Sequence, residues 1–393
     1  MSAPSRARFG AWVAALVFAT SGCLKTLDES RMDQTGGAGT TGGAGGAGAS
    51  GGGSGGAPTG GSGGSAGSGG SAGYVAYDPT KYPVTKLWAG KPPIVMAADE
   101  TDVYLATGDE ADAALRRVPI AGGADQALPP LLEKPRAMSA PSTSAFVFVV
   151  GGKNTGSDGS VVRTTKAGGP KDAIAIAGQT PLGGRAVFAA TDGFAYVTFD
   201  TDATHPVGLA RFGLGSGVAN ATALYTASGA ETSGAVVASG ACVYWVSAGD
   251  IWVMPTGGGA RVGALDAPVT DAVGLTADAA NFYYTRGDGS VWARALSGSG
   301  CDGKGAAPKQ LAAGFSNIGP VIRFKSSATV AWAARGDETQ GYAGGGVFSM
   351  PAGGGTPTQI APKESGPTAV ADSPYDVVFA TSTGELRKVP KPK

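Results

Sequence analysis

The chain has 393 residues, of which 68 are glycine, and its 30 basic and 30 acidic side chains give a formal net charge of zero. Only 15% of the residues are charged, so no basic surface is available to hold phosphates and we expect no nucleic-acid partner. The glycines follow no three-residue period, which excludes a collagen-like triple helix.

The first residues have the layout of an export signal. The sequence MSAPSRARFGAWVAALVFATSGC starts with a short basic region, continues with an apolar run from Phe9 to Ala19 and ends with small residues before Cys23. The apolar run is about half the length that a helix needs to cross a bilayer. We therefore expect export without a transmembrane anchor.

The tetrapeptide TSGC at positions 20–23 resembles the lipobox of bacterial lipoproteins, although Thr20 stands where that family usually has leucine. The resemblance implies that residues 1–22 are a signal peptide and that Cys23 carries a lipid anchor in the cell envelope. In the family, aspartate after the cysteine favours the inner membrane; here Leu24 follows, which implies the outer membrane. The alternative is ordinary secretion with cleavage after Ser21.

Residues 23–79 are predicted to be a flexible tether. Positions 36–73 consist almost entirely of Gly, Ala, Ser and Thr, whose side chains cannot bury enough apolar area to offset the entropy of ordering the backbone. Random-coil scaling gives this glycine-rich stretch a span on the order of 35 Å.

From residue 80 to residue 393 one unit is repeated seven times. Each copy has an aromatic or β-branched run and then a second apolar run, as in CVYWVSAG with DIWVMP and TVAWAARGD with GVFSMP. Corresponding positions in successive copies are 39 to 49 residues apart. A small-residue strand precedes each pair of runs, and a short outer strand follows it, for example at 309–314 and 358–362. The pattern predicts an all-β fold, a seven-bladed β-propeller of four-stranded antiparallel blades.

Proline and aspartate mark the ends of the predicted strands. The third strand ends in proline in four copies, and glycines follow it where a turn needs positive φ angles. The first strand is followed by Asp99, Asp278 and Asp372 in three copies, and we expect each of these to cap a tight turn.

The last unit ends at ELRKVPKPK and has no outer strand of its own. The segment YPVTKLWAG at 82–90 matches the outer-strand pattern, so we expect Val84 to Leu87 to pair into the final blade and close the ring. At the level of the fold, residues 80–393 resemble bacterial secreted propellers of the NHL and WD-repeat type. This resemblance rests on periodicity, since there is no WD dipeptide signature, and it implies no particular activity.

Two cysteines remain besides Cys23. Cys242 opens the second strand of unit four, and Cys301 lies in the turn after the third strand of unit five. Because these corners fall on the same face of neighbouring blades, we predict a disulfide between them in an oxidising compartment. The alternative is a pair of buried thiols.

The sequence contains few of the residues that catalysis needs. His205 is the one histidine, so a histidine cluster for metal binding or proton transfer cannot form. The segments DTDATH at 200–205 and GDETQG at 336–341 offer oxygen ligands without the spacing of a dedicated calcium loop. There is no Gly-x-Ser-x-Gly elbow, Walker loop or Cys-x-x-Cys pair. We predict no catalytic residues, no bound metal and no cofactor.

These features favour a monomeric, envelope-anchored scaffold that binds a protein or glycan partner. The connections between second and third strands vary most in length, and binding residues concentrate in such loops. The candidate contacts are Asp200, His205, Asp337, Glu338 and Tyr342. The alternative is a calcium-dependent carbohydrate-active or lactone-cleaving propeller enzyme that uses carboxylates in the channel.

Overall fold

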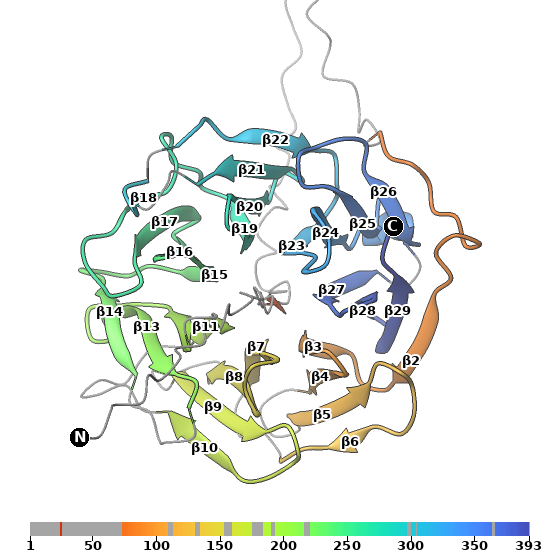
Figure 1. The fold of residues 1–393 in the computed structure, drawn as a ribbon, viewed down its shortest axis with the longest axis horizontal. Helices are drawn as coiled ribbons and strands as arrows, with labels where there is room; N and C mark the ends of the chain where they lie inside the picture. Colours follow the sequence, from red (N-terminus) through yellow and green to blue (C-terminus); the bar gives the residue numbers. More distant parts are fainter. Residues whose placement is uncertain are drawn as a thin grey trace, which may run out of the picture.

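Seven antiparallel sheets are arranged in a ring around a central axis, which confirms the predicted seven-bladed propeller (Figure 1). The computed structural model describes residues 24–25, 73–108, 113–129, 134–152, 159–174, 184–189, 193–215, 221–296, 300–303, 305–363 and 366–392. A two-residue strand, β1 (Leu24–Lys25), lies among the inner strands and pairs with one of them. Among the residues that the structure describes, no helix is both long and apolar enough to span a bilayer. The predicted signal peptide and Cys23 lie outside the described residues.

Each blade consists of four strands ordered from the channel outward. The inner strands of blades one to seven are β3 (Pro93–Ala98), β7 (Lys134–Ser139), β11 (Gly184–Ala189), β15 (Ser233–Ser239), β19 (Ala272–Ala277), β23 (Ile318–Arg323) and β27 (Pro367–Asp372). The second strands are β4 (Asp102–Thr107), β8 (Phe146–Gly152), β12 (Phe194–Phe199), β16 (Cys242–Ser247), β20 (Asn281–Arg286), β24 (Thr329–Ala334) and β28 (Asp376–Thr381). The third strands are β5 (Ala114–Pro119), β9 (Gly159–Thr165), β13 (Val207–Gly213), β17 (Asp250–Pro255), β21 (Val291–Ala295), β25 (Gly346–Pro351) and β29 (Glu385–Pro390). The outer strands are β6 (Gln126–Ala127), β10 (Lys171–Ile174), β14 (Thr222–Thr226), β18 (Val262–Gly263), β22 (Lys309–Ala312), β26 (Thr358–Ala361) and, in blade seven, β2 (Thr85–Ala89).

The ring is closed by a strand from the N-terminal side of the propeller. β2 pairs antiparallel with β29, with Thr85 opposite Lys388 and Ala89 opposite Glu385. Blade seven therefore takes three strands from the end of the chain and one from before blade one. The closing strand predicted at 84–87 is confirmed; it starts one residue later and ends two residues later.

The central residues of the second strands are mostly apolar because neighbouring blades cover both faces of these strands. Every residue of β16 is buried, including Trp245, and the aromatic run of β20 is buried in the same way. One hydrophobic cluster accordingly runs through blades two to five, and others join blades one, six and seven. The core thus lies between the blades.

Each inner strand carries one extra residue relative to its second strand. In blade three, for example, Gly184 pairs with Phe199 while Ala186 pairs with Thr198, so Arg185 is bulged out of the ladder. Equivalent register shifts occur in all seven inner strands. Small residues allow close approach here: a Cβ added to Gly274 would lie 2.6 Å from the Pro320 Cα of the next blade.

The four predicted prolines end their third strands, and the repeated glycines then form turns. In the phrase MPTGGG the amide of Gly258 donates to the carbonyl of Pro255, and in MPAGGG the amide of Gly354 donates to that of Pro351. Gly258 and Gly354 have φ angles of 96° and 103°, which side-chain-bearing residues rarely adopt. The repeated phrase therefore forms the end of the third strand and the turn that follows it.

Arginines at one register of the third strands connect successive blades. Arg117, Arg163 and Arg211 each donate from Nη1 to a backbone carbonyl just after the third strand of the next blade. The acceptors are the carbonyls of Lys166, Gly215 and Thr256, at 3.5, 2.7 and 2.6 Å. Cys242 and Cys301 also join neighbouring blades through the predicted disulfide, with their Cα atoms 5.5 Å apart.

Candidate binding face

The propeller has two faces, which differ in their connections. We call upper the face where the inner strands begin, which also carries the loops between second and third strands. The lower face is where the inner strands end. All five candidate contact residues lie in loops of the upper face, two in blade three and three in blade six.

In blade three, Asp200 has a structural role. Its Oδ2 lies 2.5 Å from Nε of Arg185, the bulged residue of the inner strand, and its Oδ1 accepts a hydrogen bond from the amide of Ser233 in blade four. The bulge turns the Arg185 side chain toward the loop and so makes this ion pair possible. Asp200 is therefore committed to holding blades three and four together.

His205 packs into the turn that precedes β13. Its Nδ1 lies 2.9 Å from Oδ1 of Asp202, and the same carboxylate oxygen accepts from the amides of Thr204 and His205. A further hydrogen bond, from the Thr204 hydroxyl, is the largest reason why the pKa of Asp202 falls to about 2. The imidazole thus belongs to a compact turn around one ionised carboxylate.

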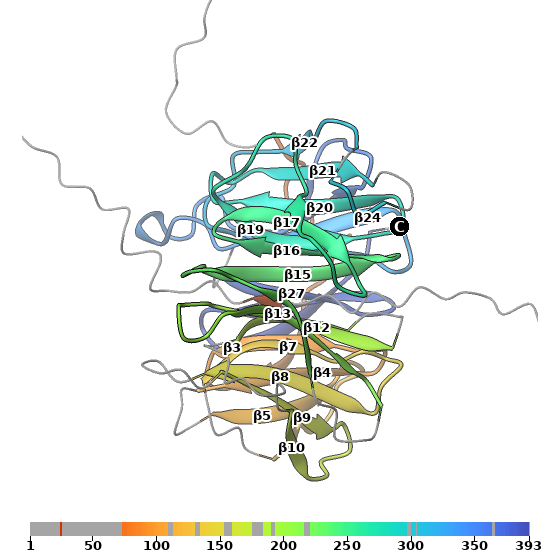
Figure 2. The same ribbon diagram turned by 90° about the vertical axis from the view of Figure 1, so that its left-hand side faces the viewer.

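The blade-six loop, residues 335–345, is longer and more exposed. Asp337 caps the 3₁₀ helix η3 (Glu338–Gln340) by accepting a hydrogen bond from the amide of Thr339, and Gly341 ends it with a φ of 62°. The Glu338 carboxylate lies 2.5 Å from Arg335, yet its side chain is 52% exposed. In the side view the loop between β24 and β25 projects from the upper face (Figure 2).

Tyr342 ties the blade-six loop to blade seven. Its φ of 61° is unusual for a residue with a side chain. Its hydroxyl lies 3.3 Å from Oε1 of Glu338 and 3.4 Å from Oγ of Ser382 in blade seven. A Cβ on Gly366 would come within 2.7 Å of the Tyr342 ring, so this glycine makes room for it. The loop is thereby fixed in one conformation.

The five predicted residues do not form one site. Asp200 and His205 contact residues of blades three and four, whereas Asp337, Glu338 and Tyr342 contact blades six and seven. Among the described residues no hydrogen bond or ion pair joins the two groups. The structure therefore offers two separate upper-face positions, of which the blade-six loop has the more exposed side chains.

Three carboxylates lie at the lower ends of the inner strands of blades one, five and seven. Asp99 and Asp278 cap turns as predicted: Asp99 accepts from the amides of Thr101 and Asp102, and Asp278 from two equivalent amides. Each also meets a cation of the following blade. The Nζ of Lys166 lies 2.8 Å from Asp99, and the Nε of Arg323 lies 3.1 Å from Asp278.

The capping prediction is wrong for Asp372. Asp372 is the last residue of β27, and Ser373 occupies the first turn position, where it accepts from the amide of Asp376. Asp372 is instead buried, 2.7 Å from Nζ of Lys391. Burial raises the pKa of Asp372 above its usual value despite that lysine. At all three positions a cation already compensates the carboxylate.

A charged and aromatic cluster on the upper side of blades three and four was not predicted. Glu231 accepts two hydrogen bonds from the Arg261 guanidinium, each of 2.9 Å, and further ones from Tyr225 and Ser247. The guanidinium lies 4.2 Å from the Tyr225 ring centroid and 4.0 Å from that of Trp252. Burial alone would raise the pKa of Glu231, but these hydrogen bonds outweigh it and lower the pKa. Tyr225, Ser247 and Arg261 are 6, 16 and 30 residues from Glu231 in sequence, so no local motif shows the cluster.

Within the described residues, no group of three or more His, Cys, Asp and Glu side chains is arranged to hold a metal ion. The loops at 200–205 and 336–341 present their carboxylates to backbone amides, hydroxyls and neighbouring basic groups. What the upper face can provide chemically is a rigid set of hydrogen-bonding and charged side chains.

Comparison of the sequence with protein-family models and with curated proteins finds no match. Solved propellers share the fold. YCF48 bound to a D1 peptide is 15% identical with a TM-score of 0.53, over 81% of this chain and 98% of that one. The Cps50 (Swd1) propeller domain of Myceliophteria thermophila is 9% identical with a TM-score of 0.54, over 79% and 100%.

An enzyme with the same fold is also similar. A catalytically inactive variant of virginiamycin B lyase from Staphylococcus aureus, solved with quinupristin, is 11% identical with a TM-score of 0.50, over 79% of this chain and 100% of that one. At such identities the likeness establishes the fold and leaves the function to be argued from this chain's own residues. The chain is therefore a seven-bladed β-propeller.

Proposed function

We propose that the protein is an exported, lipid-anchored scaffold that binds a protein partner through the upper face, chiefly through the blade-six loop. The observation that carries the proposal is the loop itself. It is held in one conformation by the Asp337 cap and by Tyr342, while Glu338, Thr339 and Gln340 remain exposed. A fixed loop loses little conformational entropy when a partner binds, which favours recognition.

Two of the similar propellers support a binding role in general terms. YCF48 was solved with a peptide, and the propeller domain of Doa1, 11% identical with a TM-score of 0.50, is of the WD40 type. The enzymatic alternative lacks a comparable observation here. The three carboxylates at the lower ends of the inner strands are paired with lysine or arginine, and His205 is bound to Asp202.

Site-specific photo-crosslinking tests the binding proposal. A photoreactive amino acid at Gln340 should crosslink one protein in intact cells, and the same group at Tyr375, 84% exposed on the lower face, should not. The partner identified must then bind the purified protein and lose affinity for a Glu338→Ala, Thr339→Ala double variant. Equal crosslinking at both positions, or a partner that consists of glycan alone, would contradict the proposal.

The anchor is tested separately. If Cys23 is lipidated, an alkyne-tagged palmitate should label the wild-type protein and place it in the membrane fraction, and Cys23→Ala should abolish both. Cleavage after Ser21 without lipid would instead give an unlabelled soluble product with Gly22 at its N-terminus, which mass spectrometry distinguishes.

A further inference from the structure

A short segment before the closing strand is bound to the outside of blade six. We call residues 74–84 the strap. Although the sequence suggested a propeller that starts at residue 80, Val75 already pairs with β26 in parallel: its amide donates to Pro357 and its carbonyl accepts from Gln359, at 2.8 and 2.9 Å. The Tyr74 ring meets the edge of Phe348 at a centroid distance of 5.0 Å. The strap thus has a defined position on the rim.

The second half of the strap is equally well fixed. Asp78 accepts hydrogen bonds from the amide and hydroxyl of Thr80, and its carbonyl accepts from the amide of Tyr82, whose side chain is buried. The Tyr77 hydroxyl donates to the Tyr82 carbonyl at 3.0 Å, which sets the direction of the Tyr77 ring. These hydrogen bonds fix the strap against the propeller.

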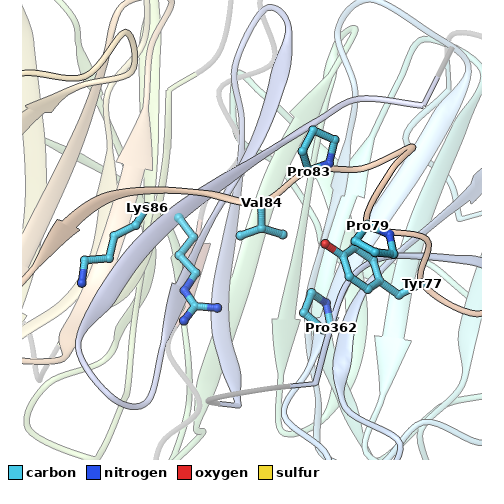
Figure 3. A pocket seen from close by; sticks show the side chains of 7 residues that line it. Tyr77, Pro79, Pro83, Val84, Lys86 and Pro362 are labelled. Atoms are coloured by element: carbon cyan, nitrogen blue, oxygen red, sulfur yellow. The ribbon is translucent and has the colours of Figure 1, made fainter.

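Between the strap and blades six and seven lies a cavity of about 540 Å³. This volume falls within the range of small-ligand sites. One side is apolar and is formed by Tyr77, Val84 and three prolines, whereas Lys86 reaches the other side (Figure 3). Its lining residues are Tyr77, Pro79, Pro83, Val84, Lys86, Pro362 and Arg387.

The polar side of the cavity has one positive charge in excess. Lys86 and Arg387 are directly opposite each other in the β2–β29 ladder, an arrangement of like charges that destabilises a sheet. One carboxylate serves both: Glu385 lies 3.1 Å from Lys86 Nζ and 2.7 Å from Arg387 Nε. These two hydrogen bonds lower the pKa of Glu385, which keeps it ionised. The three side chains together carry a charge of about +1 at neutral pH.

We propose that this cavity binds a carboxylate carried on an aromatic or alkyl group. The anion would meet Lys86 and Arg387 beside Glu385 and neutralise the remaining positive charge, while the apolar group would pack on the prolines and Tyr77. Such a group is offered by a small carboxylic acid or by the C-terminal residue of a peptide. No residue of the blade-six loop lines the cavity, so the proposal does not depend on the proposed function.

Phenylacetate and its neutral analogue phenylacetamide are the first probes. For a ligand of this size we expect a Kd of about 1 mM, measured by NMR titration of the purified protein at low salt. The amide should bind about three- to fivefold more weakly, which corresponds to one partly exposed charge pair. The Kd for phenylacetate should also rise with salt. Equal binding of the two probes, or no binding, overturns the proposal.

The tripeptide acetyl-Gly-Gly-Phe, with a free or amidated C-terminus, distinguishes the two sources. Tighter binding of the free-acid peptide than of phenylacetate identifies a peptide end as the ligand, and the reverse order identifies a small acid.

The Lys86→Gln variant should weaken the binding of phenylacetate about three- to fivefold. Because the Lys86 side chain is 56% exposed, this variant should fold normally. Lys81→Gln, on the same strap but outside the cavity, is the matched control. Equal losses in both variants would also overturn the proposal.

Discussion

Glu231 shows how much the function of a residue here depends on partners that are remote in sequence. Its carboxylate takes hydrogen bonds from a guanidinium, a phenol and a hydroxyl, and the guanidinium in turn lies between two aromatic rings. A cation between aromatic faces gains electrostatic attraction in addition to its ion pair. The cluster therefore joins blades three and four through several coupled interactions.

Replacing Glu231 by glutamine should destabilise the protein by about 1–2 kcal/mol, because Arg261 keeps an acceptor but loses its counter-charge. Chemical denaturation of the wild-type and variant proteins measures the difference. Asp266→Asn is the control: Asp266 pairs with Arg294, but its side chain is 67% exposed, so we expect less than about 0.5 kcal/mol. A loss at Asp266 equal to that at Glu231 would contradict this account.

The same residue predicts a pH dependence. The pKa of Glu231 in the folded state is lower than that of an ordinary glutamate, because hydrogen bonds from Arg261, Ser247 and Tyr225 outweigh burial. Its ionisation therefore stabilises the fold above the unfolded-state pKa, and this contribution is lost as the pH falls through the lower folded-state pKa. The difference in Tm between wild type and Glu231→Gln should be largest near neutral pH and should shrink below about pH 4. A difference that stays constant down to pH 3 would contradict the pKa shift.

Among residues, local signals were predictable and long-range pairs were not. The Asp99 and Asp278 caps follow from residues two or three positions away. Asp372 lies one position earlier, as the last residue of its inner strand, so the capping role belongs to Ser373. The Arg117, Arg163 and Arg211 contacts could have been found, since all three arginines share one register of the repeat.

At the level of elements, β2 has a role that differs from its position in the chain. It is the outer strand of blade seven but precedes blade one, so it fastens the two ends of the repeat region together. Without it, β29 would expose an unpaired edge. The sequence indicated this strand because the last unit lacked an outer strand, whereas the strap beside it has no repeat pattern and was not predicted.

Deleting residues 80–90 should lower the Tm by several degrees. The deletion removes β2 and also Tyr82, whose side chain is 4% exposed and by itself contributes about 2 kcal/mol of burial. Thermal unfolding followed by circular dichroism measures the change. An equal deletion in the glycine-rich stretch, residues 50–60, should leave the Tm unchanged. If both deletions have the same effect, β2 does not close the ring.

The disulfide is the second element that connects distant segments. It spans 59 residues and joins the start of β16 to the connection between β21 and β22. Loop-closure entropy for this separation gives about 4 kcal/mol as an upper value. The double variant Cys242→Ser, Cys301→Ser should therefore have a lower Tm than the wild type. Reductant should lower the Tm of the wild type and leave the Tm of the double variant unchanged. Two free thiols under native alkylation would rule out the bond.

At the scale of the whole molecule, the repeat made the fold predictable and gave little information about function. Apolar periodicity specifies the seven blades because each second strand must be covered on both faces. The candidate contact positions depend on which loops are long and on how their side chains pair. The sequence correctly placed the five candidate residues in loops between second and third strands. It did not show how far apart the two loops are, because that depends on where blades three and six lie in the ring.

The three carboxylates of the lower face share a property that bears on metal binding. Asp99, Asp278 and Asp372 would have to release Lys166, Arg323 and Lys391 before they could bind calcium. Calcium or a chelator should therefore leave the Tm unchanged within error, as measured by differential scanning calorimetry. Lys166→Met with Arg323→Met frees two of the carboxylates and serves as a comparison in which added calcium can raise the Tm. A wild-type Tm that falls with chelator would instead support the calcium-dependent enzyme, because ligand release lowers the stability of a protein that binds the ligand in its folded state.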